Sequence, residues 1–400
     1  MKQKLLLLSL TTLAACSSDT SSGVGLTDDT ATRADSGTEA DTTEADSGAE
    51  ADTTADDTAE VDTAAADSGA EADTTADDTG EVDTTEADTA VADTGTEDTT
   101  APDTGVPPDR CQVIRDSITA AGFGDVVAVS CDGTHAMITS NTYPDHELMN
   151  GIIGTNEQIP VPAKDHTVPI PLNPVMAASY TTIDAALGVA VNGVPIYDYS
   201  SAGALDPSVY DARYDCVVTH QLDHCGGHAG RGDDYHYHAS PTCMLEAMDN
   251  RGDDAIIGWG FDGYPIYGNN NPDGSAIAPG TLDVCNGQPD PTFGYRYHTS
   301  DGPPYIIQCL VGEVDQTIIP RVRPLSHEGG GGGRPSGRPP EGGVQNLAYT
   351  VSAEGMHALE YDYNGQHYYL HYTATGDNCY AFETKTVTSG GVVETGTYCR

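Results

Sequence analysis

The sequence predicts a mostly β, disulfide-stapled domain that follows a long disordered N-terminal stalk. Three observations predict this class. Residues 16–109 are almost entirely Asp, Glu, Ala, Thr, Ser and Gly, with no aromatic side chain. The rest of the chain has short Val-, Ile- and Tyr-rich runs broken by Gly and Pro, without long helical periodicity. The chain also carries ten cysteines, which is typical of proteins that fold in an oxidising compartment.

The N-terminus is predicted to be an export signal. Lys2 and Lys4 precede an apolar run that is too short to cross a membrane as a helix. The run ends in "LAAC", which resembles the lipobox of bacterial lipoproteins, so residues 1–15 are expected to be a lipoprotein signal peptide and Cys16 the lipidated residue. Because Ser17 rather than Asp follows, the pattern favours an exported protein, anchored by lipid in the outer membrane of a bacterial cell envelope. An ordinary signal peptide with a chance cysteine is the alternative.

The acidic segment 16–109 is expected to be a disordered stalk. The sequence "DSGAEADTTADDT" occurs at 46–58 and again at 67–79, and such a tract buries too little apolar surface to offset its ordering entropy. The formal net charge is −46 at pH 7, and residues 110–400 still hold 34 acidic against 13 basic residues. Nucleic acid is therefore excluded as an expected partner, because phosphate binding needs a basic face.

Residues 110–326 are expected to form a β-rich domain with an internal two-fold repeat, in copies at about 192–243 and 262–309. Matching landmarks occur in the same order in both copies: "NGVPIYDY" and "DGYPIYGN", "LDHCGGH" and "LDVCNGQ", "YHYHAS" and "YRYHTS". "DVVAVSC", "GVAVNGVPIY" and "AIIGWGFDGYPIYG" are predicted strands. Two related β-units are the expected result.

The last part of the chain is predicted to be a Gly/Pro linker, 327–343, followed by a small β-hairpin domain, 344–400. Asn364-Gly365 lies between two alternating runs, which is a strong hairpin signal. A second apparent hairpin follows, so we expect a small antiparallel sheet closed by Cys379 and Cys399.

The repeat also predicts disulfides, since each copy has two cysteines in corresponding order. The expected bridges are Cys225–Cys243, Cys285–Cys309, Cys111–Cys131 and Cys379–Cys399. This pairing leaves Cys216 as the odd residue once Cys16 is assigned to lipid. Sequence alone leaves other connectivities open.

The two copies differ in their histidines. Alternate side chains of a strand share a face, so His236 and His238 are expected on one face, and the tyrosines between them on the other. The second copy keeps both tyrosines, as Tyr295 and Tyr297, whereas Arg296 replaces His236. Likewise Gln288 takes the place of His228, and His298 alone keeps its histidine, corresponding to His238. This pattern indicates tyrosines for the core and histidines for a site on the first copy.

These residues carry a family resemblance. "GGH" followed by "YHYH" and then "GWGFDGYPIYG" resembles the YHYH domain family of bacterial secreted proteins. The upstream "NTYPDHEL" and the downstream "LDVCNG", "YRYH" and "PPYIIQCLVG" continue the match over roughly residues 110–326. The resemblance implies an extracytoplasmic domain and assigns it no activity.

The histidine pattern predicts a copper or zinc site formed by His228, His236 and His238. His-x-His on a strand presents two imidazoles on one face, and imidazole suits both metals. His146 or His298 is a candidate for the remaining position.

Two other functions stay open at this stage. One is a non-catalytic surface module that binds glycan or protein, in which the histidines are structural. The other is a metal-dependent hydrolase in which Asp145 or Asp234 acts as the base toward a metal-bound water.

Overall fold

The computed structural model describes residues 109–328, 333–334 and 337–400. These residues form a β-rich fold with short helices and a separate C-terminal antiparallel sheet, which confirms the predicted class. The predicted signal peptide, the lipidated Cys16 and the stalk up to residue 108 lie outside the described residues. Within the described ranges, no helix has the length and apolar character needed to cross a membrane.

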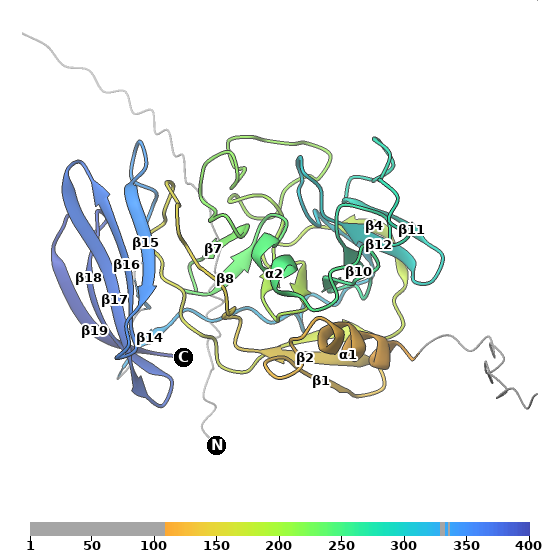
Figure 1. Ribbon diagram of the computed structural model, residues 1–400, viewed down its shortest axis with the longest axis horizontal. Helices are drawn as coiled ribbons and strands as arrows, with labels where there is room; N and C mark the ends of the chain where they lie inside the picture. Colours follow the sequence, from red (N-terminus) through yellow and green to blue (C-terminus); the bar gives the residue numbers. More distant parts are fainter. Residues whose placement is uncertain (1–108, 329–332, 335–336) are drawn as a thin grey trace, which may run out of the picture. The chain divides into compact units, whose positions relative to one another are not determined.

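The elements are numbered in chain order, and Figure 1 labels many of them. The helices are α1 (Arg110–Ala120) and α2 (Thr242–Ala247). The strands before the linker are β1 (Ala128–Cys131), β2 (His135–Ser140), β3 (His166–Pro171), β4 (Met176–Thr181), β5 (Gly188–Ala190), β6 (Pro195–Ile196), β7 (Gly227–Ala229), β8 (Tyr235–Tyr237), β9 (Gly258–Gly260), β10 (Pro265–Tyr267), β11 (Gly287–Asp290), β12 (Gly294–His298) and β13 (Leu310–Gly312). The remaining strands are β14 (Ser326–His327), β15 (Gln345–Val351), β16 (Met356–Tyr363), β17 (Gln366–Gly376), β18 (Cys379–Lys385) and β19 (Val393–Cys399).

The central sheet displays the sequence repeat as a pseudo-two-fold arrangement. Its eight strands run in the order β11-β12-β10-β9-β5-β6-β8-β7, so each copy contributes four strands in the same relative order. The halves meet where β5 and β9 pair antiparallel, with Val189 opposite Trp259. In both halves the next pairing outward is antiparallel, β5 with β6 and β9 with β10, and the one after it is parallel, β6 with β8 and β10 with β12. The structure thus extends each copy upstream, to residues 188 and 258.

The tyrosines of the repeat form matched parts of the core, as the sequence predicted. Tyr235, Tyr237, Tyr295 and Tyr297 are all buried. The Tyr235 hydroxyl donates to the Asp223 carboxylate at 2.9 Å, and Tyr295 donates to Asp283 at 2.7 Å. Asp223 and Asp283 occupy equivalent positions in the two copies. Each provides the hydrogen-bond partner that a buried tyrosine hydroxyl needs.

Helix α1 is absent from the sequence prediction. Asp109 caps it by accepting a hydrogen bond from the backbone N–H of Cys111 at 3.1 Å. Ile114 and Ile118, one helical turn apart, are fully buried, and the helix lies beside β1 and β2 (Figure 1). Two apolar positions give too weak a helical period to be recognised in the sequence.

The C-terminal residues form a six-stranded sheet in the order β14-β19-β18-β17-β16-β15. Tyr363 pairs with Gln366, so Asn364-Gly365 is a two-residue turn, and both of its residues have positive φ. This is the geometry that Asn-Gly favours in hairpins. Cys379 and Cys399 lie directly opposite one another on β18 and β19 and are bonded.

All four predicted disulfides are formed. Cys111–Cys131 joins α1 to β1, while Cys225–Cys243 and Cys285–Cys309 lie at corresponding places in the two copies. Cys216 lies outside these bridges and is buried.

Candidate metal centre

Three histidines of the first copy meet on one face of a hairpin. His228 on β7 lies directly across from His236 on β8, and His238 directly follows β8. Residues 230–234 connect the two strands. Because side chains alternate along a strand, Tyr235 and Tyr237 point into the opposite side. All three imidazoles are buried, with 2, 5 and 3 % exposure for His228, His236 and His238.

The rings form a nearly regular triangle. Their centroids lie 4.9 Å apart for His228 and His236, 5.0 Å for His228 and His238, and 4.8 Å for His236 and His238. One nitrogen of each ring lies within 4.8 Å of the other two. Tetrahedral zinc bound to imidazoles places the nitrogens roughly 3.4 Å apart, so the three nitrogens would have to move closer together to hold an ion.

Backbone oxygens fix the outer nitrogens of two of these rings. His238 Nδ1 donates to the carbonyl of Asp198, and His236 Nδ1 lies 3.3 Å from the carbonyl of Asp234. The Asp234 carboxylate is also 3.6 Å from His236 Nδ1. Such contacts orient metal-binding histidines and select the tautomer whose Nε2 carries the lone pair. The arrangement therefore leaves Nε2 of His236 and His238 for a ligand.

The Nε2 atom of His228 is the strongest indication that the cluster binds a ligand. Its Nε2 is buried and has no hydrogen-bond partner among the described residues. A buried polar nitrogen without a partner costs about 1–3 kcal/mol, so its placement calls for a physical reason. A metal ion held by the three rings would supply one.

Burial keeps two of the rings in the neutral form that binds metals. Burial and the neighbouring His236 and His238 rings lower the pKa of His228 well below its ordinary value. Burial and His236 also lower the pKa of His238, to about 3. Both rings are thus neutral at physiological pH, and their lone pairs do not have to lose a proton first.

The second copy holds a permanent cation at the corresponding place. Arg296 lies across the hairpin from Gln288, as His236 lies across from His228. The Arg296 guanidinium contacts His298 Nε2 at 2.9 Å and Asp290 at 2.7 Å. Gln288 Nε2 is 3.0 Å from the same His298 nitrogen. Of the three side chains equivalent to the histidines, Arg296 therefore supplies a guanidinium group, and both it and Gln288 contact His298.

His298 consequently does not join the first cluster. Its Nδ1 contacts the carbonyl of Gly268 at 2.8 Å, as His238 contacts Asp198 in the first copy. It is the counterpart of His238 within its own half of the sheet and binds Arg296 there.

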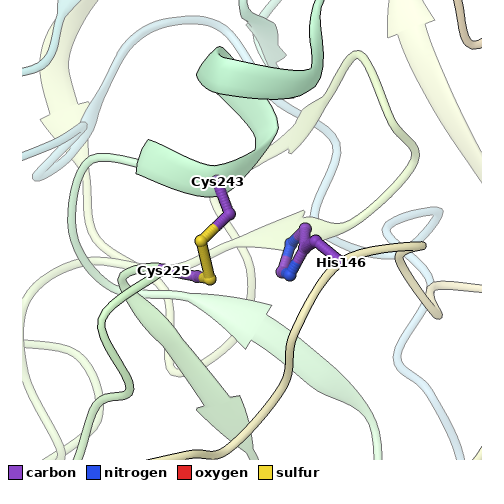
Figure 2. Close-up of side chains that lie close together, drawn as sticks. All are labelled: His146, Cys225 and Cys243. Atoms are coloured by element: carbon purple, nitrogen blue, oxygen red, sulfur yellow. A yellow bond between two sulfur atoms is a disulfide. The ribbon is translucent and has the colours of Figure 1, made fainter.

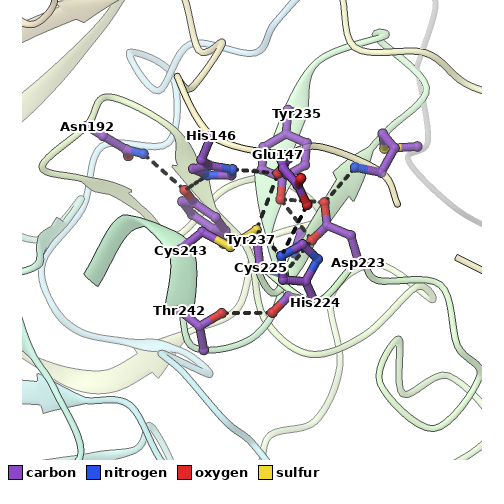
Figure 3. Close-up of a disulfide and its surroundings, with 12 residues drawn as sticks. His146, Glu147, Asn192, Asp223, His224, Cys225, Tyr235, Tyr237, Thr242 and Cys243 are labelled. Atoms are coloured by element: carbon purple, nitrogen blue, oxygen red, sulfur yellow. Dashed lines mark hydrogen bonds and ion pairs between the residues drawn. A yellow bond between two sulfur atoms is a disulfide. The ribbon is translucent and has the colours of Figure 1, made fainter. Parts of the chain in front are cut away.

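His146 lies on the tyrosine side of the hairpin. Figure 2 shows its ring beside the Cys225–Cys243 bridge. Its Nε2 is 2.8 Å from the Tyr237 hydroxyl, which also accepts a hydrogen bond from Asn192, as Figure 3 shows. It therefore cannot complete the three-histidine cluster. The two sulfurs beside it are joined in a disulfide, so this second grouping lacks the thiolates that bind metal ions.

Of the two proposed bases, only Asp234 lies at the cluster. Its carboxylate stands behind the His236 ring, at Nδ1, which is the place of an orienting group rather than of a base. Burial alone would raise the pKa of Asp234. The hydrogen bond with His236 and the nearby Arg400 outweigh burial, so the pKa lies below its ordinary value. Asp145 is exposed and neighbours His146.

The loop between the ligand-bearing strands is held by distant parts of the chain. The Arg400 guanidinium donates to the carbonyls of Gly232 at 2.7 Å and Asp233 at 3.2 Å. Arg334, inside the stretch predicted to be a linker, forms a buried ion pair with the Asp233 carboxylate. Sequence reasoning missed both arginines, because nothing local links them to a loop more than 100 residues upstream.

Comparison with known proteins finds a match to one protein family. Neither a curated protein nor a solved structure matches the chain. The model of the YHYH protein family matches residues 167–278, which include the whole hairpin of the first copy and strands β9 and β10 of the second. This range is narrower than the one expected from the sequence, and it contains His228, His236 and His238. Residues 167–278 are therefore a YHYH-family segment.

Proposed function

We propose that this protein binds one copper or zinc ion through His228, His236 and His238. The buried, unpartnered Nε2 of His228 carries the proposal, because neither packing nor hydrogen bonding among the described residues accounts for it. The near-triangular placement of the rings adds support. Imidazole ligands favour copper and zinc over calcium or magnesium.

Three histidines leave a coordination position for water or another ligand, which is the pattern of exchangeable rather than purely structural zinc sites. Metal storage, redox chemistry and hydrolysis all use such a position. Because Asp234, the proposed base that lies at the cluster, is positioned at Nδ1 of His236, metal binding itself is the function that we propose.

The test is elemental analysis of the full chain, produced without a histidine tag in an oxidising compartment, stripped with a chelator and reloaded with copper or zinc. We expect about one ion per chain, and loss of the ion in the His236→Gln/His238→Gln variant. A folded parent that stays metal-free with both ions would refute the proposal.

The chain offers a matched control in His298→Gln. This substitution removes the histidine equivalent to His238 from the other copy and should leave metal content unchanged. A circular dichroism spectrum of each variant separates loss of metal from loss of fold.

We further propose that the protein is a lipoprotein of the bacterial cell envelope, held in the outer membrane through Cys16. The "LAAC" motif after a short apolar run supports this location. A Cys16→Ser variant should no longer take up labelled palmitate and should lose its membrane association. Palmitate labelling that persists in the variant would contradict the assignment.

A further inference from the structure

A cavity of about 520 Å³ opens directly beside the histidine cluster. His236 and His238 form part of its wall, whereas His228 lies behind them. The volume falls in the range of pockets that hold small organic molecules. A ligand in this cavity would therefore lie against two of the three imidazoles of the cluster.

The walls of the cavity are largely apolar. Ile183, Ala185, Val322 and Leu325 line it together with Tyr197, whose ring centroid lies 4.3 Å from that of His236. Such walls favour a ligand with an apolar or aromatic body, since burying apolar surface is the main source of affinity in such pockets.

Cationic side chains are concentrated at the same cavity. Arg231, Arg321 and Arg323 line it, although the whole chain has only 16 Lys and Arg residues against 62 Asp and Glu. A cluster of guanidinium groups on such an acidic protein is a local attraction for anions, and guanidinium matches carboxylate geometry.

Three aspartates also line the cavity, and each of them has partners within the protein. The Asp234 carboxylate lies 3.6 Å from His236 Nδ1. The Asp198 carboxylate accepts a hydrogen bond from the backbone N–H of Ser200 at 2.8 Å. The third, Asp184, contributes its backbone carbonyl to the Arg321 guanidinium at 2.5 Å. This contact holds Arg321 at the cavity.

We propose that the cavity binds a small organic carboxylate with an apolar body, whose charged end meets the arginines and the bound metal. This inference rests on the proposed metal binding for one of its two anchors, and on Arg321 and Arg323 for the other. The ligand exchanges with water at the metal and undergoes no covalent change.

The test uses benzoate as the carboxylate and benzamide as its neutral analogue, titrated calorimetrically into the full chain loaded with Cu(II). We expect saturable benzoate binding, benzamide binding weaker by at least about tenfold, and a change in the copper electron paramagnetic resonance spectrum with benzoate only. The Arg321→Gln/Arg323→Gln variant, which changes two exposed side chains, should bind benzoate about tenfold more weakly. The exposed Arg251, outside the cavity, provides the control Arg251→Gln, which should bind as the parent does.

Equal affinity for benzoate and benzamide, or benzoate binding unchanged by the double substitution, would overturn the inference. So would the absence of saturable binding in a sample with stoichiometric copper. Copper content measured on the same samples reports on the metal site independently. Failure of the metal site and failure of the cavity are thus distinguished.

Discussion

Arg296 on β12 is the structural counterpart of His236 on β8, and each lies opposite the residue at the matching position of its own hairpin. One copy thus places a guanidinium where the other gathers imidazoles. The guanidinium is bound by Asp290, a carboxylate that is 8 % exposed. Within one sheet, the second copy therefore holds the guanidinium of Arg296 at the place where the first copy is proposed to bind an exchangeable metal ion.

This equivalence predicts that a second metal site can be restored. The Gln288→His/Arg296→His variant recreates three histidines in the second copy, with His298 already in place. We expect metal content to rise from about one to about two ions per chain, measured by elemental analysis after dialysis. Arg296→Gln alone should leave it unchanged. A folded double variant that still binds a single ion would show that the second copy lacks the required geometry.

The stability of the metal-free protein should fall in mild acid because of His238. Its pKa is lowered from 6.5 to about 3, so the unfolded chain takes up this proton at a higher pH than the folded chain does. The contribution of His238 to the free energy of unfolding is fully present above about pH 6.5. It is lost as the pH drops toward 3, which lowers the free energy of unfolding by roughly 3–5 kcal/mol. Urea unfolding in a chelator, compared with His238→Gln, isolates the effect. The variant should have the shallower pH dependence, and parallel curves would contradict the assignment.

Arg400 is distant from the three histidines in sequence but should stabilise the loop that joins β7 and β8. Besides Gly232 and Asp233, its guanidinium donates to the carbonyls of Val161 at 2.7 Å and Arg323 at 2.7 Å. Arg400→Ala removes the partner of these carbonyls, most of which are partly buried. We expect a loss of about 3 kcal/mol in unfolding free energy and about tenfold weaker metal binding. Denaturant unfolding and competition with a chromogenic chelator measure the two effects. Unaltered metal affinity would show that the loop held by Arg400 does not contribute to metal binding.

Each repeat disulfide should contribute to stability by a similar amount. The Cys225→Ser/Cys243→Ser variant and its counterpart, Cys285→Ser/Cys309→Ser, are each expected to lose about 2–5 kcal/mol. Thermal and denaturant unfolding provide the measurement. Peptide mapping without reductant should recover both bridges within their own copies, and a peptide that links Cys225 to Cys285 would be inconsistent with the pairing.

Local patterns made much of this molecule predictable from sequence. The alternation "YHYH" assigns His236 and His238 to one face because a strand has a period of two. Asn364-Gly365 marks a turn by backbone conformation alone. The order of the cysteines in the repeat predicts two of the disulfides, Cys225–Cys243 and Cys285–Cys309.

Features that depend on contacts between residues far apart in the chain could not be predicted from the sequence. His146 was a reasonable fourth ligand by residue type, yet its loop reaches the tyrosine side of the hairpin and contacts Tyr237. The cavity could not be foreseen, since residues near 183, 231 and 322 come together only in the folded chain. Arg296 was visible as a difference between copies, but its role required the register and the Asp290 contact.

The four disulfides also suit a chain that is oxidised while it is still being made. Their partners are separated by 20, 18, 24 and 20 residues in sequence. Each bridge needs only its own short stretch of chain, so a thiol oxidase can complete it before later segments emerge. The bridges follow one another without interleaving, and the order of synthesis, from Cys111–Cys131 to Cys379–Cys399, is itself a route to the native pairing.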